Sequence, residues 1–200
     1  MAEIIGKIGR ESGGFRVVYD IDSRFGRREL WRAISDRDDL AVWLGTFSND
    51  LVAGSHFTVE YLNDSHYDIS GTVREIAQLR TLDYDWKFGD YPTTQVRFEL
   101  KNGHVNGTHL RLIVSGLDED DVVRAASTWH AQLEFLRLFL NQIPVPAYAL
   151  RFRRDELLAA YEQQVRSLGT APASSDAASP STPARHNPAL SVMHSHAYLA

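Results

Sequence analysis

Alternation of apolar and polar residues along the chain predicts six β-strands. The first covers residues 15–22, in which Val17, Tyr19 and Ile21 share one side. From residue 56 onward the same period of two returns in five further runs that are joined by short turns. A period of two directs neighbouring side chains to opposite faces of a sheet. Five consecutive strands of this kind are typical of an antiparallel meander with one polar face and one aromatic face.

Spacings of three and four residues predict the helices. Two short helices are expected between the first strand and the meander, with a break near residues 35–39. After the meander, a long helix carries a single apolar stripe that can lie in a concave sheet. This stripe consists of Val122, Ala126, Trp129, Leu133, Leu136 and Leu140. The helix is expected to end before Pro144 and Pro146, because proline cannot continue it.

The opposite face of the long helix is apolar as well. Ala131, Phe135 and Leu138 point away from the stripe and would be exposed if this helix were the outermost layer. Large exposed apolar patches usually mark an interface, so we expect this face to be covered. One candidate cover is a further amphipathic helix from Arg154 to Leu168. The other is a homodimer or a protein partner that contacts Phe135, Leu138 and the same further helix.

These elements predict an α+β domain of the helix-grip type. A curved antiparallel six-stranded sheet wraps around the long C-terminal helix, and one extra C-terminal helix packs against it. We expect an N-terminal segment at residues 1–12, the helix-grip domain at 13–145 and the additional packing helix at 146–168. Residues 169–200 are rich in Ala, Ser and Pro and are expected to be a disordered tail. A length of 200 residues fits one domain of this size plus a tail.

Composition narrows the classes of function. The chain has no cysteine, which excludes disulfides, thiolate metal sites and a cysteine nucleophile. Its net charge of −5, with acids and bases interspersed, argues against nucleic acid as a partner. No stretch approaches the ~18 apolar residues of a membrane span, so we expect a cytoplasmic protein without a membrane partner. The histidines lack the spacing of metal ligands, and we expect neither a metal nor a cofactor.

Aromatic residues on the inward faces are the main candidates for a binding site. They are expected to project into the space between the sheet and the long helix, together with Leu133. As a group they can line an apolar pocket for a small hydrophobic ligand, with hydroxyl and indole groups to orient it. The alternative is that each is simply part of the core. The aromatic candidates are Trp43, Tyr61, Tyr84, Trp86, Phe98 and Trp129.

Two groups of charged side chains offer weaker candidates. His130 lies beside the apolar stripe and can reach the pocket mouth as a titratable group. Glu134 and Arg137 follow it at helical spacing, so an exposed ladder of ion pairs along the helix is the alternative. Asp83 and Asp85 share the strand face opposite the aromatic residues, and we expect both to be exposed to solvent.

Several short motifs, taken in order, resemble one known family. The segment WRAISD at residues 31–36, followed by Leu40, Trp43 and Leu44, is similar to the signature of the domain named after the activator of the heat-shock-protein-ninety ATPase. That domain is part of the START-like superfamily, which includes the birch-pollen allergen and polyketide cyclases. The resemblance extends over residues 13–143. It departs from the family at Thr128, where glycine is common.

The resemblance implies a helix-grip fold with an interior cavity, and three hypotheses for function follow. The first is a small-molecule-binding module, with a regulatory or stress role, that holds an apolar or aromatic ligand. The second is a cyclase or hydrolase that uses the same cavity, with His130 or a buried tyrosine as the acid or base. The third is a protein-interaction or co-chaperone-like domain. The superfamily includes carriers, enzymes and co-chaperones, so the fold alone does not select one of them.

Overall fold

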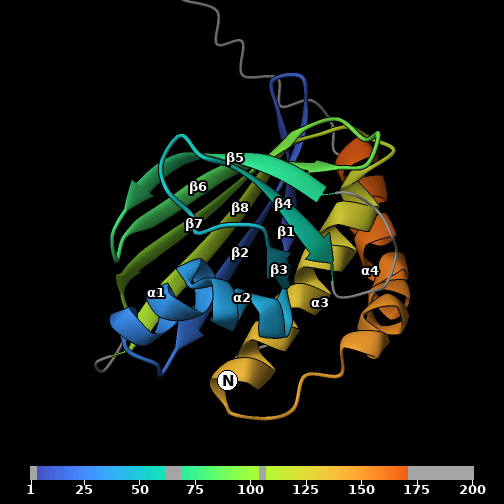
Figure 1. The fold of residues 1–200 in the computed structure, drawn as a ribbon. Coiled ribbons are helices and arrows are strands. Elements are labelled where there is room, and N and C mark those ends of the chain that lie inside the picture. Colours follow the sequence, from blue (N-terminus) through green and yellow to red (C-terminus); the bar gives the residue numbers. More distant parts are fainter. Residues whose placement is uncertain (1–3, 62–68, 104–106, 171–200) are drawn as a thin grey trace, which may run out of the picture.

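The computed structural model describes residues 4–61, 69–103 and 107–170, and within them the chain forms one large sheet with four α-helices (Figure 1). The predicted tail, from residue 171 onward, lies outside the described residues. The strands are β1 (Lys7–Glu11), β2 (Gly14–Ser23), β3 (Gly45–Phe47), β4 (His56–Tyr61), β5 (Ile69–Ala77), β6 (Thr81–Phe88), β7 (Thr94–Asn102) and β8 (Thr108–Leu117). The helices are α1 (Arg27–Ser35), α2 (Arg37–Trp43), α3 (Val122–Leu140) and α4 (Leu150–Thr170), with a short 3-10 helix, η1 (Ala147–Ala149), before α4.

The sheet has eight antiparallel strands in the order β1-β2-β8-β7-β6-β5-β4-β3. Strands β4 to β8 form the predicted meander, and β2 returns to pair with β8. The α+β helix-grip fold is therefore confirmed. The sheet has two strands more than the predicted six, because the short strands β1 and β3 extend its two edges.

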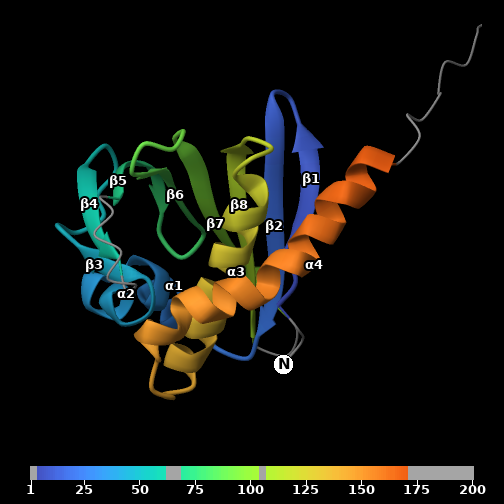
Figure 2. The ribbon, with the colours of Figure 1, turned by 90° about the vertical axis from the view of Figure 1, so that its right-hand side faces the viewer.

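Helix α3 lies between the concave face of the sheet and helix α4 (Figures 1 and 2). Its stripe residues Leu133 and Leu136 are buried on the sheet side. On the other side Phe135 is buried and Leu138 is half-buried. The predicted helical cover is confirmed by the packing of α4 along α3, and α4 begins at Leu150 instead of Arg154.

Strand β1 is an element that the sequence pattern does not predict. Its five residues contain a single large apolar side chain, Ile8, which is buried. The strand is held from both sides, by β2 within the sheet and by side chains of α4. The backbone N–H of Gly6 donates to the hydroxyl of Tyr161 at 3.0 Å, and the N–H of Ile8 donates to Gln164 Oε1 at 3.2 Å. Residues near the N-terminus and residues of α4, more than 150 positions later, therefore stabilise each other.

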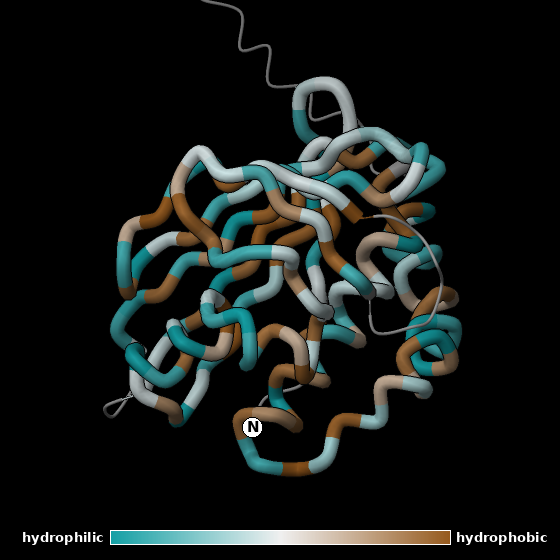
Figure 3. Tube along the Cα trace, in the orientation of Figure 1, coloured by the Kyte–Doolittle hydropathy of each residue, from teal (hydrophilic) through white to brown (hydrophobic). Residues whose placement is uncertain are grey.

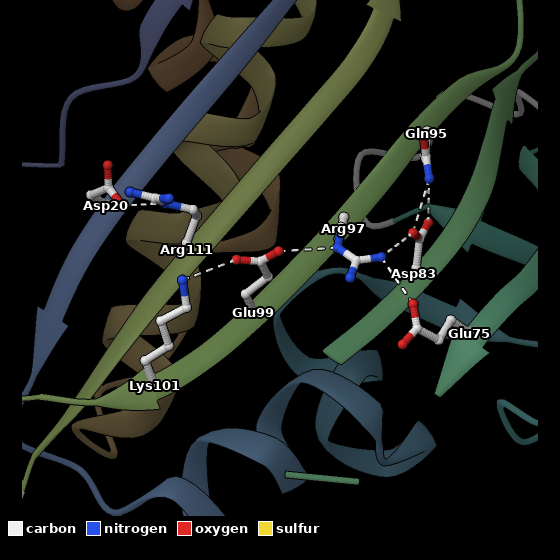
Figure 4. A network of polar contacts seen from close by, with 8 residues as sticks. All are labelled: Asp20, Glu75, Asp83, Gln95, Arg97, Glu99, Lys101 and Arg111. Atoms are coloured by element: carbon white, nitrogen blue, oxygen red, sulfur yellow. Dashed lines mark hydrogen bonds and ion pairs between the residues drawn. The ribbon is translucent and has the colours of Figure 1, made fainter. Parts of the chain in front are cut away.

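The outer face of the sheet is covered by a cross-strand network of charges (Figure 4). Arg97 lies at its centre and donates to Asp83, Glu75 and Glu99 at distances of 2.8 to 3.1 Å. Gln95 also donates to both carboxylate oxygens of Asp83. Asp83 was expected to be exposed but is only 3% exposed. Its carboxylate is on the predicted face, and its direct neighbours on that face shield it from solvent.

Replacing Gly6 with alanine is expected to destabilise the domain by about 1–3 kcal/mol, because overpacking a filled site costs this much. A methyl group at Gly6 would lie 2.6 Å from Tyr19 Cε1 and 2.9 Å from the hydroxyl of Tyr161. The free energy of urea unfolding measures the effect. Gly9→Ala is the matched control, since a methyl group at Gly9 meets no atom within 4 Å. Equal stabilities of the two variants would contradict the assignment of this packing.

Candidate functional site

Four aromatic side chains form a closed ring of contacts between the sheet and helix α3. We call them the aromatic quartet: Tyr84 and Trp86 from β6, Phe98 from β7 and Trp129 from α3. The ring centroids are 5.8 Å apart for Tyr84 and Trp86, and 5.6 Å apart for Trp86 and Trp129. Phe98 closes the circle at 6.2 Å from Trp129 and 6.3 Å from Tyr84. These four candidates, which come from two strands and a helix, therefore lie together between the sheet and α3.

Two further phenylalanines extend the aromatic quartet toward the edge of the sheet. Phe57 from β4 lies 5.6 Å from the ring of Tyr84, in an edge-to-face arrangement. Phe47 from β3 lies 5.1 Å from Phe57 and 6.4 Å from Trp86. Both are buried. Sequence reasoning missed Phe47 because a strand of three residues is too short to show a period of two.

The remaining aromatic candidates have other positions. Trp43 is fully buried at the end of α2, and its indole N–H donates to the carbonyl of Ala33 at 2.8 Å. That bond ties α2 to α1 and engages the one polar atom of the Trp43 side chain. Tyr61 ends β4, where its backbone pairs with Gly45, and its side chain lies outside the described part of the structure.

Gln132 is a buried polar side chain that sequence reasoning did not single out. It is 0% exposed, and neither its amide oxygen nor its amide nitrogen has a hydrogen-bond partner in the described part of the chain. On α3 it follows Trp129 by three residues, a spacing that places two side chains next to each other on one helix face. The sequence offered one signal for this residue, which is an amide side chain directly beside the apolar stripe of the long helix. Leaving such a group buried and unpaired costs about 1–3 kcal/mol.

His130 lies on the other flank of α3, in a cluster of buried polar groups that faces α4. Its Nδ1 is 2.8 Å from the hydroxyl of Tyr161, and its Nε2 is 3.5 Å from Glu134 Oε1. Its ring meets the rings of Tyr161 and Tyr19 edge-on, at 5.9 and 6.5 Å. Of the alternative, an exposed ladder of ion pairs, the contact between His130 and Glu134 is present, but the exposure and the partner Arg137 are wrong, because His130 is only 6% exposed and Glu134 pairs with Arg153 of α4. The burial of His130 could not be predicted from its own helix, because the partners Tyr161 and Arg153 come from α4.

Electrostatics explain why this cluster is stable although it is buried. Arg153 donates two hydrogen bonds to the carboxylate of Glu134, at 2.6 and 2.8 Å. Burial raises the pKa of Glu134, but the hydrogen bonds from Arg153 and His130 and their charges outweigh it, so the pKa falls to about 2. Burial raises the pKa values of Tyr19 and Tyr161, so both hydroxyls keep their protons. The cluster therefore contains a charge-assisted pair and neutral hydroxyls, which suits a structural clamp between α3 and α4.

The described part of the molecule also has hollows, two of which lie on different sides of the sheet. A cavity of about 20 Å³ lies between α3 and the strands near the N-terminus, and Leu133, Leu136 and Ile4 are among the residues that line it. This volume holds about one water molecule. An open hollow of about 400 Å³ on the outer face of the sheet is lined by polar residues that include His56, Thr72 and Lys87. Among the described residues, no group of three or more His, Cys, Asp or Glu side chains is arranged to hold a metal ion.

Comparison with known structures shows which proteins share this fold. CalU16 from Micromonospora echinospora is 21% identical with a TM-score of 0.66, and the match covers 83% of this chain and 99% of CalU16. DynU16, a protein in the dynemicin biosynthetic locus, is 23% identical with a TM-score of 0.59, over 65% of this chain and 49% of DynU16. EF2215 from Enterococcus faecalis, a conserved protein of unknown function, is 14% identical with a TM-score of 0.63, over 82% of this chain and 91% of EF2215. These matches show that the chain shares its helix-grip fold with these proteins.

The family follows from the sequence match. The family model described as activator of Hsp90 ATPase homolog 1-like protein matches residues 24–141, which is more than half of the chain. The chain therefore belongs to this family, as the motifs around Trp31 and Trp43 indicate. No curated protein matches the chain. Within the described residues, no helix has both the length and the apolar character that crossing a membrane requires.

Replacing Glu134 with glutamine is expected to lower stability at neutral pH and to weaken its dependence on acid. The pKa of Glu134 falls from 4.5 to about 2 on folding, so the carboxylate stabilises the fold above pH 4.5. This contribution is lost as the pH falls from 4.5 to about 2. It amounts to about 3 kcal/mol at most.

Urea unfolding at a series of pH values through this window measures the effect. The free energy of unfolding should fall less steeply with acid in Glu134→Gln than in the wild type. Glu162→Gln is the control, because Glu162 forms an exposed pair with Arg166 of the same helix. Identical pH profiles for Glu134→Gln and the wild type would contradict the prediction.

Proposed function

We propose that the protein is a binding module for a small, largely apolar or aromatic molecule that is held against the aromatic quartet. The polar group of this ligand would bond to the amide of Gln132. The observation that carries the proposal is the amide itself, which is fully buried and has no hydrogen-bond partner in the described part of the chain. Nearly all buried polar groups in proteins are paired, so an orphaned amide beside aromatic rings is typical of a ligand site.

The chemistry around Gln132 supports a ligand of this class. The amide offers one acceptor and two donors, so it can orient a hydroxyl, a carbonyl or an amide group. The rings of Trp86 and Trp129 offer flat apolar surfaces of a size that suits a fused aromatic system. The amide of Gln132 and the rings of Trp86 and Trp129 are all buried. A ligand that contacts them would therefore be recognised by its shape and by a single polar contact. The setting of DynU16 in a biosynthetic locus is compatible with handling of small molecules in this fold.

The enzyme alternative has less support. His130 was the best candidate for an acid or base, but both of its ring nitrogens face protein groups, Tyr161 and Glu134. A general acid or base must lie within hydrogen-bond reach of a substrate atom. His130 also lies on the flank of α3 that faces α4, while Gln132 lies on the opposite flank. We therefore place recognition at Gln132 and a structural role at His130.

A matched pair of probes tests the hydrogen bond from Gln132. We expect 2-naphthol to bind about fivefold more tightly than naphthalene, because one added neutral hydrogen bond contributes about 1 kcal/mol. The rise in the thermal unfolding midpoint at equal probe concentration measures both affinities. In Gln132→Met, which keeps the side-chain volume but removes the amide, the preference for 2-naphthol should disappear.

Two controls separate this result from a general loss of structure. Ser127→Ala removes another buried polar group of α3, whose hydroxyl donates to the carbonyl of Val123, and it should keep the preference. Without ligand, Gln132→Met should be as stable as the wild type or more so, since replacing an unpaired polar group by an apolar one is nearly neutral or favourable. Absence of stabilisation by either probe, or an unchanged preference in Gln132→Met, would contradict the proposal.

A further inference from the structure

The connection between α3 and α4 exposes apolar side chains at one end of the molecule. Ile143 is 50% exposed, Tyr148 is 82% exposed and Phe152 is 61% exposed. In Figure 3 this connection forms the lower rim of the molecule and carries alternating hydrophobic positions. Tyr148 lies in η1, and Phe152 follows four residues later in the first turn of α4. We call residues 141–152 the α3–α4 corner.

Positive charge lies in and beside this corner, at Arg151 within it and at arginines that flank it. Residues 135–154 contain four arginines and no aspartate or glutamate, although the whole chain has a net charge of −5. Arg153 and Arg154 pair with carboxylates that lie outside this stretch. In the described residues, Arg137 and Arg151 have no carboxylate within ion-pair distance. Arg24 also has no carboxylate partner among the described residues. It lies at the same corner, because its guanidinium donates to the side chain of Asn141 at 2.8 Å.

We propose that the α3–α4 corner docks on an anionic lipid surface. Exposed aromatic and aliphatic side chains partition into the interfacial layer of a bilayer, and arginines beside them attract anionic headgroups. The guanidinium of Arg151 lies 5.7 Å from the ring centroid of Phe152, so charge and apolar surface are next to each other. Pro144 and Pro146 in the same connection have no backbone N–H group that would lose a water partner on insertion.

A lipid surface suits this corner better than two other occupants. A second copy of the chain joined through the same face would bring the unpaired arginines of the two copies together, because a two-fold contact uses the same patch twice. A nucleic acid would pair with the arginines but would leave Ile143 and Phe152 without an apolar partner. The expectation of no membrane partner rested on the absence of a spanning stretch, and surface docking does not need one. The proposal does not depend on a ligand at Gln132.

Co-sedimentation of the full chain with vesicles tests the proposal. We expect binding to vesicles of phosphatidylcholine mixed with phosphatidylglycerol, weaker binding to pure phosphatidylcholine, and loss of binding at high salt. Arg24→Gln with Arg151→Gln should weaken binding by about tenfold or more. Its matched control is Arg16→Gln with Arg80→Gln, which changes the net charge equally at two exposed arginines elsewhere and should bind nearly as the wild type does.

A second pair of variants tests the apolar side chains. Phe152→Ser should weaken binding severalfold, whereas Val52→Ser, at a residue that is 59% exposed in another part of the molecule, should not. Circular dichroism of each variant checks that the fold is retained. Equal loss of binding in the matched controls would overturn the proposal. Equal binding to neutral vesicles, tighter binding to duplex DNA than to anionic vesicles, or a dimer that Phe152→Ser dissociates would also overturn it.

Discussion

Burial of helix α3 on both its broad sides is the constraint on which the rest of the structure depends. The sheet covers one side through the aromatic quartet, and α4 covers the other (Figure 2). A helix in this position buries several of its polar side chains away from water, and each buried one needs a partner inside the protein. Helix α4 supplies those partners for His130 and Glu134, through Tyr161 and Arg153. The described residues supply no hydrogen-bond partner for Gln132. Paired polar groups therefore mark the structural clamp at His130 and Glu134, and the unpaired amide marks the candidate site.

Patterns that depend on neighbouring residues could be predicted from the sequence. The apolar stripe of α3 and the alternation in the meander are local, and they led to the helix-grip fold and to the inward positions of Trp86 and Trp129. The second apolar face of α3, with Phe135, could be interpreted without knowing its partner, since a long exposed apolar face needs a cover. This argument led to a second C-terminal helix, which the structure confirms.

Features that depend on distant residues could not be predicted in this way. Strand β1 has little apolar content, and it is held by Tyr161 and Gln164 from more than 150 residues away. His130 was interpreted from its own helix, where Glu134 and Arg137 are the near neighbours. The contact that decides its environment comes from Tyr161, 31 residues later. The burial of Asp83 likewise depends on Arg97 and Gln95 of the adjacent strand.

The net charge of the chain does not describe the charge of each part of its surface. On the outer face of the sheet, acids and bases alternate within hydrogen-bond distance, so their fields cancel within a few ångströms (Figure 4). Asp20 illustrates this, because its hydrogen bond from Arg111 lowers the pKa of its carboxyl and fixes the pair. At the α3–α4 corner Arg24, Arg137 and Arg151 have no such carboxylate partner among the described residues, and their field extends into solvent over about a Debye length. A protein with an acidic total charge can therefore present a positive end to an anionic surface.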